Sequence, residues 1–465
     1  MKASLTFYRT AGNNNHLQLL INDMHFITDR QTLEELNLSG KFRKGTVHHL
    51  FNQVKTRGGE QLLDVMFREP LTNAASINQR SSIFQYFQQV RQDFPFDAEQ
   101  VNLMREYLDA GEAKQAALVL ATTLTRRLLS ILTRDGQYKK NIQGLQATIV
   151  NLHKCYSFIS RLQAMPGPWT EKIESIARIL NHKRMERLRA MDIYKALPAT
   201  TIAFYNHLLK HVLKEEMEQV LLFIYEVDVN IAVSEVAHKR GFCYAKAFPE
   251  EDNIFSARAL SHPCIEGGVG NNLLLHRNSN IIFLTGANMA GKSTLMKSVG
   301  IAMYLAHMGF PVAASHLEFS VREGIYSSIN VADNIGLGYS HFYAEVVRVK
   351  QAAEAAASGK SLLLMFDELF KGTNVKDAYD GTLAVTEAFA SYRKCIFIVS
   401  THIIEVGEAL RKQDNIQFVY MPTIMQGSKP KYTYRLQDGI TEDRQGMMII
   451  GNEGILQMLE GEVQG

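Results

Sequence analysis

Residues 281–300 hold the feature that most constrains the fold of this chain. The segment reads IIFLTGANMAGKSTLMKSVG: an apolar run, then Gly286-x-x-x-x-Gly291-Lys292-Ser293, then a helical pattern. Glycines let such a loop wrap closely, so that its backbone N–H groups and the next helix N-terminus face phosphate oxygens. The lysine then reaches the β- and γ-phosphates, and the serine hydroxyl ligates Mg²⁺. With these flanks, the motif predicts a P-loop that binds ATP and Mg²⁺ rather than a chance strand–helix turn.

A second apolar run, LLLMFDE, ends in the carboxylates Asp367 and Glu368. Nucleotide hydrolysis needs one carboxylate to hold Mg²⁺ through water and another to polarise the attacking water. We assign the first role to Asp367 and the second to Glu368. An acidic pair at a strand end is more often a helix cap or a solvated turn, but a P-loop in the same domain favours the functional interpretation.

His402 ends a third apolar run, in IFIVSTHIIEV. An imidazole at this position could sense the γ-phosphate. A lone histidine is usually structural, but His402 follows a strand that comes after the Asp367–Glu368 strand. We therefore place it in the same site.

The two halves of the chain differ in pattern. Proline is absent between Pro95 and Pro166 and over 199–248, and apolar residues recur there at three- or four-residue spacing, which predicts long amphipathic helices. After the loop AFPEEDN (247–253), short apolar runs alternate with helical segments, as in a buried parallel sheet. The predicted fold is an all-helical domain over 1–250, followed by an α/β domain over 251–465.

Composition narrows the class of protein. Hydrophobic residues make up 46% and charged residues 21% of 465 residues, which indicates a globular chain. The N-terminal segment lacks the apolar core of a signal peptide, and no run is long enough for a membrane helix. We expect a soluble, cytoplasmic protein. Four separated cysteines without CxxC spacing suggest neither a disulfide framework nor a zinc site.

Charge is distributed unevenly. Residues 1–250 carry 32 Lys and Arg against 25 Asp and Glu, whereas residues 251–465 carry 18 against 22. If DNA binds, the first half is the expected contact surface. The candidate phosphate contacts, for each of which a solvated surface position is the more common explanation, are Arg126, Arg127, Lys139, Lys140, Lys183, Arg184, Arg187 and Arg189.

Taken together, these motifs resemble the MutS family of DNA mismatch repair ATPases, within the wider ABC-type ATPases. In the second half the resemblance rests on TGANMAGKST (285–294), ADNIGLGYSHFYAE (332–345), LLLMFDELFKGTNVKDAYDG (362–381), STH (400–402) and DGITEDRQGMMI (438–449). ALSHPCIE (259–266) resembles the strand that opens the ATPase domain. The segments that resemble the MutS core or lever region are DRQTLEELNL (29–38), TRGGEQLLDVMFREPLTNAASINQR (56–80) and YEVDVNIAVSEVAHKRGF (225–242).

The resemblance implies a role for each candidate residue. Catalysis falls to Glu368 and His402, and the metal to Ser293 and Asp367. It also implies a homodimer of ATPase domains, in which Ser340 of one subunit reaches the γ-phosphate bound by Lys292 of the other. ATP hydrolysis would then be coupled to lever motion. The nucleotide contacts that it implies are Gly286, Asn288, Gly291, Lys292, Ser293, Thr294, Ser340 and Asn374, the last from the D-loop along the seam.

The chain departs from the family pattern in four places. Core-like sequence begins near residue 29, so we expect no mismatch-reading or connector domain. The helical middle looks too short for a full DNA clamp. Tyr339 and His341 stand where the family usually has Arg and Thr, and the D-loop has extra residues around Val375–Ala378. No C-terminal helix-turn-helix for dimerisation is expected after Met448.

Three functions remain open on this sequence. The first is an ATPase that clamps or senses DNA in mismatch repair or recombination-related processing, without mismatch recognition of its own. The second is an ATP-switched scaffold whose helical arms hold a protein partner. The third, the ATPase subunit of a transporter, is disfavoured because residues 29–80 resemble MutS. A steep dependence of DNA binding on salt would separate the first two functions.

Overall fold

The computed structural model describes residues 25–111, 115–133, 136–189, 191, 197–329, 341–426, 429–441 and 458. These residues form two compact units. The helical unit contains Asn52–Arg68 and Ser82–Glu235. The sheet unit contains the described residues up to Phe51, Glu69–Ser81 and the chain from Val236 onward.

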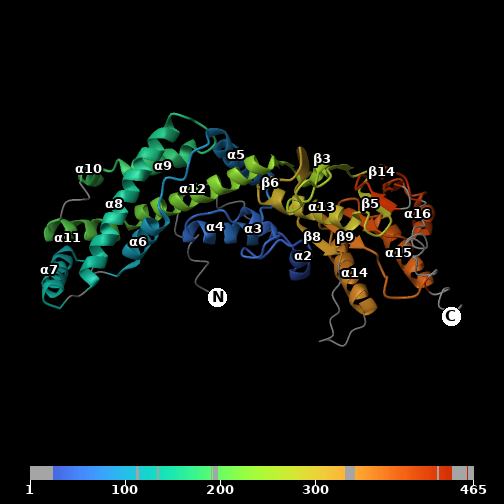
Figure 1. Ribbon diagram of the computed structural model, residues 1–465, viewed down its shortest axis with the longest axis horizontal. Helices are drawn as coiled ribbons and strands as arrows, with labels where there is room; N and C mark the ends of the chain where they lie inside the picture. The colour runs from blue at the N-terminus through green and yellow to red at the C-terminus, as the bar shows by residue number, and fades with distance from the viewer. Residues whose placement is uncertain are drawn as a thin grey trace. The chain divides into compact units, whose positions relative to one another are not determined.

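The helical unit is built from long helices around an aromatic core. Trp169 stacks on Phe223, with ring centroids 5.2 Å apart, and packs edge-on against Phe87. The predicted helix near residue 120 is α7, and the two longest helices are α8 and α12 (Figure 1). The helices of this unit, some of which extend into the other, are α4 (Arg57–Arg68), α5 (Ala74–Val90), α6 (Ala98–Asp109), α7 (Ala116–Thr133), α8 (Gly136–Gln163), α9 (Thr170–Leu180), η1 (Lys183–Met185), α10 (Glu186–Arg189), α11 (Ala199–His207), the π-helix η2 (Leu208–Val212) and α12 (Lys214–Arg240).

The sheet unit is centred on a mostly parallel sheet (Figure 1). In the described residues its strand order is β14-β11-β5-β10-β9-β8, and only β14 is antiparallel to its neighbour. The three strands predicted from apolar runs are β5, β9 and β10, so this part of the prediction is confirmed. The strands are β5 (Ile281–Gly286), β8 (Gly324–Ser328), β9 (Leu362–Asp367), β10 (Ile396–Ser400), β11 (Ile416–Met421) and β14 (Gln437–Asp438).

Both faces of the central strands are buried, which explains their continuous apolar runs. On one face Phe389 stacks between Phe366 and Phe397. On the other, α13 packs so closely that a Cβ on Gly300 would lie 2.6 Å from Met365. The helices of this unit are α2 (Arg30–Glu35), α3 (Val47–Phe51), η3 (Glu250–Asp252), α13 (Lys292–His307), α14 (His341–Ala357), α15 (Val375–Phe389) and α16 (Ile404–Leu410).

Smaller sheets complete the unit. One has the strand order β2-β7-β3-β4, and the pairs β1–β6 and β12–β13 are antiparallel. Within the described parts of the chain, no helix is long and apolar enough to span a bilayer. The strands of these sheets are β1 (Cys243–Tyr244), β2 (Lys246–Phe248), β3 (Phe255–Leu260), β4 (Asn271–Leu275), β6 (Pro311–Val312), β7 (His316–Ser320), β12 (Thr423–Gln426) and β13 (Lys429–Tyr432).

The compact units are not divided where the sequence predicted a boundary. Residues 25–51 and 69–81 belong to the sheet unit, although the prediction placed them in the helical domain. Strands β1 and β2 also lie before residue 250. They form there because they pair with β6 and β7 of the sheet unit. In its described residues, the segment over 1–250 thus contains two short strands beside its helices. A division into separately folding domains at residue 250 stays a prediction.

Candidate active site

The glycine-rich loop connects β5 to α13. Gly286 has φ +143° and Gly291 has φ +103°, conformations that side chains disfavour. Space is also limited, because a Cβ on Gly286 would lie 3.1 Å from the carbonyl oxygen of Met421. The loop ends at Gly291, which precedes α13 directly. The two glycines therefore allow the tight path that the sequence predicted for them.

Lys292, the first residue of α13, is folded back onto this loop. Its Nζ donates to the carbonyl oxygens of Gly286 at 2.8 Å and Ala287 at 3.2 Å. Burial lowers the pKa of Lys292, and the nearby carboxylates of Asp367 and Glu368 oppose that shift. The side chain is thus a buried cation whose present acceptors are neutral carbonyls, which anionic oxygens could replace.

Ser293 and Asp367 meet between α13 and the end of β9. The Ser293 hydroxyl donates to Oδ2 of Asp367 at 2.5 Å. The other oxygen, Oδ1, is buried and has no hydrogen-bond partner among the residues that the structure describes. Mg²⁺ is usually held by one or two carboxylates together with substrate phosphates and waters. A hydroxyl beside a carboxylate with an unused oxygen fits that donor set.

Glu368 and His402 form a pair at the ends of the neighbouring strands β9 and β10. His402 Nδ1 lies 3.4 Å from Oε1 of Glu368. This contact lowers the pKa of Glu368 and raises the pKa of His402, because each charge stabilises the other. Glu368 also has φ +54°, and its N–H donates to the carbonyl oxygen of Ser400 at 2.7 Å. The strands therefore hold the pair in a defined position.

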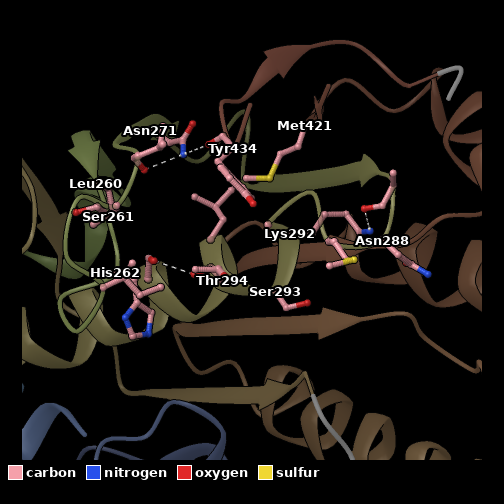
Figure 2. Close-up of a pocket in the computed structure, with 18 of the residues that line it drawn as sticks. Leu260, Ser261, His262, Asn271, Asn288, Lys292, Ser293, Thr294, Met421 and Tyr434 are labelled. Carbon is pink, nitrogen blue, oxygen red and sulfur yellow. Dashed lines mark hydrogen bonds between the residues drawn. The ribbon is translucent and has the colours of Figure 1, made fainter. Parts of the chain in front are cut away.

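A cavity of about 580 Å³ lies over the loop. Figure 2 shows Lys292 and Asn288 at one end, His262 at the other and Tyr434 between them in this view. The lining also includes Ser293, Thr294, Gly291, Glu368 and the apolar side chains Ile265, Val269 and Met421. The cavity thus combines a cationic loop with an apolar wall, which suits a ligand with phosphates and a ring system.

The apolar wall of this cavity was not predicted from the sequence. Asn271 holds the segment that carries Tyr434 against this side of the cavity. Its amide donates to the carbonyl oxygen of Tyr434 at 2.9 Å, and its Oδ1 accepts from the N–H of Leu436 at 2.8 Å. Burial lowers the pKa of His262, and Lys297 adds to that shift. No local spacing joins residues 262 and 434. The only signals were the neighbouring motifs ALSHPCIE and DGITEDRQGMMI.

The other predicted residues are not all brought to this cavity. Ser340 lies outside the described residues. Asn374 caps α15, where its Oδ1 accepts from the N–H of Asp377 at 3.0 Å, and it does not line the cavity. Among the predicted DNA contacts, Arg189 is half-buried over the ring of Tyr156, and the side chain of Arg187 is outside the described residues. Arg126 is half-buried, and the exposed ones are Arg127, Lys139, Lys140, Lys183 and Arg184.

Comparison with known proteins adds independent evidence. Residues 282–458 match the family model MutS domain V. A DNA mismatch repair protein MutS from Anaplasma phagocytophilum (strain HZ) is 30% identical over 49% of this chain, and one from Pseudothermotoga lettingae is 30% identical over 50%. The Lactococcus lactis subsp. cremoris (strain SK11) protein of that name is 26% identical over 51%. These matches span only 28–29% of the relatives' own length. Residues 282–458 of the chain are therefore similar to MutS domain V, and about half of the chain is similar to part of the MutS proteins named.

Proposed function

We propose that the chain is a Mg²⁺-dependent, ABC-type P-loop ATPase of the MutS type. The observation that carries the proposal is one cavity that joins Lys292 and Ser293 of the loop to Glu368, with Asp367 bonded to Ser293. The named relatives are mismatch repair proteins. The match covers 28–29% of their length.

The residues divide the chemistry among them. Lys292 exchanges its loop carbonyls for β- and γ-phosphate oxygens, and Gly286, Asn288, Gly291 and Thr294 frame the phosphates with the loop backbone and helix start. Ser293 and Asp367 would hold Mg²⁺, which would offset phosphate charge. Glu368, ionised at neutral pH, orients and polarises the attacking water. His402 contributes a proton donor near the γ-phosphate.

We further propose that two ATPase domains form a homodimer. Ser340 of one subunit would contact the γ-phosphate at the other subunit's site, and Asn374 would lie along the seam. The position of the D-loop supports this: Gly372, two residues before Asn374, packs on the first turn of α14, where a Cβ would lie 3.0 Å from the Phe342 amide nitrogen. The D-loop and the chain after Ser340 are therefore neighbours.

The helical domain would contact DNA through its backbone or overall shape, with ATP hydrolysis driving a clamp-like motion. Exposed cations on the helical unit support this, for example Lys139 and Lys140 on α8. Such contacts supply the sequence-independent electrostatic part of binding. ATP, Mg²⁺ and DNA occur together in the cytoplasm, where we place the protein.

Two substitutions test the ATPase. Lys292→Ala should weaken nucleotide binding, because the triphosphate loses its principal cation. Glu368→Gln should keep binding but lower turnover by about 100-fold or more, since a base acts on the chemical step. Glu405→Gln, an exposed acidic position on α16, is the matched control and should turn over normally. Unchanged turnover in Glu368→Gln would remove Glu368 from the mechanism.

A second function is favoured by apolar exposure on the helical unit. Leu118 and Phe204 are 53% and 54% exposed, and α7 packs against α11. Each of the two packed helices thus exposes a large apolar side chain, and exposed apolar patches are typical of protein-binding surfaces. The alternative is therefore an ATP-switched scaffold whose helical arm binds a protein. DNA affinity that does not change with salt, or is absent, would favour the scaffold.

A further inference from the structure

The outer edge of the main sheet is covered by a segment from the N-terminal part of the chain. Among the described residues β8 is the last strand on that side, and Ile27 forms a parallel bridge with Gly324. The N–H of Ile27 donates to the backbone carbonyl oxygen of Glu323 at 2.7 Å, and the N–H of Ile325 donates to the carbonyl oxygen of Ile27 at 2.9 Å. Only glycine fits at position 324, because a Cβ there would lie 2.3 Å from the carbonyl oxygen of Ile27.

Beyond this bridge, side chains continue the pairing. The N–H of Ser327 donates to Oγ1 of Thr32 at 3.1 Å, and the N–H of Ile329 donates to Oε2 of Glu35 at 2.9 Å. Glu35, which is buried, also accepts the Ser327 hydroxyl at 2.5 Å. Residues 27–35, which we call the strap, thus satisfy the edge amides of β8 and of the residue that follows it.

The strap also binds α14 through Arg348, whose side chain is buried. The guanidinium forms an ion pair with Asp29 and donates to Oγ1 of Thr32 at 2.9 Å and to the carbonyl oxygen of Ser327 at 2.7 Å. Burial raises the pKa of Asp29, but the hydrogen bonds from Arg348 and Thr32 outweigh it, so the pKa lies below its usual value. One cation therefore joins α14, β8 and the strap.

The two elements held by the strap, β8 and α14, both contact residues that lie next to the carboxylates Asp367 and Glu368 in the sequence. Ser328 at the end of β8 pairs with Phe366, directly before Asp367. Phe342, in the first turn of α14, packs on the ring of Phe370, which follows Glu368 by two residues. In contrast, none of the described residues that line the cavity belongs to the strap, β8 or α14.

We propose that the strap positions the hydrolytic carboxylates, with Glu35 of the strap and Arg348 of α14 as the positioning residues. The proposal rests on the proposed ATPase function and adds a segment outside the matched residues 282–458. Because the strap holds β8 and α14 but does not line the cavity, it sets the rate of hydrolysis and leaves nucleotide affinity unchanged.

Three variants test this. Arg348→Lys keeps the charge but loses the planar fork of donors. Glu35→Gln keeps the size but exchanges an anionic acceptor for an amide. Gly324→Ala pushes the strap from the sheet edge without changing either charged group. The control is Lys350→Gln on the same helix, where an exposed lysine pairs with Glu354 at 3.8 Å.

The full chain is used, with binding of a fluorescent ATP analogue and single-turnover ATP hydrolysis as readouts. We expect the Kd of each strap variant to stay within about twofold of the parent and the hydrolysis rate to fall tenfold or more, with the control unchanged. Amide hydrogen exchange at Ile325, Ser327 and Ile329 should be faster in the variants. Glu35→Gln and Gly324→Ala keep the test decisive if Arg348→Lys does not fold.

Two results would overturn the strap proposal. One is hydrolysis within twofold of the parent in all folded variants. The other is a loss of binding and hydrolysis in equal proportion, which indicates a purely structural role. Failure of the underlying function looks different, because the unchanged chain would then bind or hydrolyse no ATP with Mg²⁺.

Discussion

At the scale of single residues, the candidate base Glu368 has a strained backbone. A residue other than glycine with φ near +54° costs of order 1 kcal/mol, and such costs are often found at functional sites. Here the strain comes with a hydrogen bond to Ser400 and a partner in His402. The backbone therefore sets the direction of this carboxylate before any ligand binds.

The Glu368–His402 pair should make stability depend on pH. The raised pKa of His402 contributes stability below about pH 6.5 that is lost as pH rises through the folded value. The lowered pKa of Glu368 contributes stability to the folded state above about pH 4.5, and this stability is lost as pH falls through the folded pKa. The pair is thus most stabilising between these values. The pair contributes less than about 1 kcal/mol to the free energy of unfolding, because the side chain of His402 is exposed and solvent screens its charge.

Thermal unfolding of His402→Gln without nucleotide checks this. The variant should melt below the parent at pH 6 and together with it at pH 9. Glu368→Gln should show the same trend, and the double variant should lose no more than either single one. An equal deficit of His402→Gln at both pH values would show that its charge is not involved.

Individual residues of the site were predictable to different degrees. Lys292, Ser293, Asp367, Glu368 and His402 follow strand ends or the loop, and parallel strands bring such ends to one edge of a sheet. The structure places them together. Tyr434 and His262 could not be predicted, since only tertiary packing brings positions so distant in sequence to one cavity.

At the scale of elements, α13 connects the site to the segment that precedes β8. It begins at Lys292 and ends at His307, which is fully buried. His307 Nδ1 lies 2.7 Å from the carbonyl oxygen of Leu71, and its Nε2 accepts the N–H of Arg322 at 3.1 Å. Burial lowers the pKa of His307 to about 4. The end of this helix is therefore sensitive to acid.

Acid should destabilise the chain through His307. Its folded pKa is depressed, so the unfolded state binds more protons between about pH 6.5 and 4, and stability falls as pH falls through that range. The penalty is roughly 2 kcal/mol at pH 5. His307→Gln can keep both hydrogen bonds without titrating. Urea unfolding at pH 7.5 and 5 should show a smaller loss in this variant than in the parent.

The exposed His276 gives the control for this measurement. His276→Gln should lose as much stability between pH 7.5 and 5 as the parent. If His307→Gln loses as much as the parent too, the acid sensitivity arises elsewhere.

Hydrophobic periodicity predicted several of the helices and strands themselves, but it did not predict which of the two units each segment joins. Apolar runs predicted β5, β9 and β10, and helical spacing predicted α7. Residues 29–38 were assigned to the helical domain because of sequence order and resemblance. They pack in the sheet unit because the edge of β8 and the buried Arg348 need acceptors, a requirement that no local pattern expresses.

At the scale of the whole molecule, composite sites in a dimer predict complementation. Lys292→Ala and Ser340→Arg should each be inactive alone. A mixed dimer holds one site with both defects and one with neither, so mixing the two proteins should restore part of the ATPase activity. Each variant mixed with itself is the control. If no activity returns although mixed dimers form, the sites are not shared.

DNA binding is the last property expected of the whole molecule. The exposed cations of the helical unit lie on helices and supply an electrostatic attraction to phosphates, which does not depend on sequence. Discrimination of a single mispaired base normally requires a side chain that inserts at an easily kinked step. We therefore expect equal affinity for matched and mismatched duplex at equal salt. Branched DNA offers more phosphate, so any preference among DNA structures should be for branched DNA.

Charge removal makes this expectation specific. Lys139→Gln with Lys140→Gln on α8 should weaken binding of matched and mismatched DNA equally, and each lost phosphate contact should reduce the slope of log K against log salt by about 0.9. Lys350→Gln in the sheet unit should change neither. A tenfold preference of the parent for a mismatch, about 1.4 kcal/mol, would contradict the electrostatic account, because it requires a residue that reads the mispair itself.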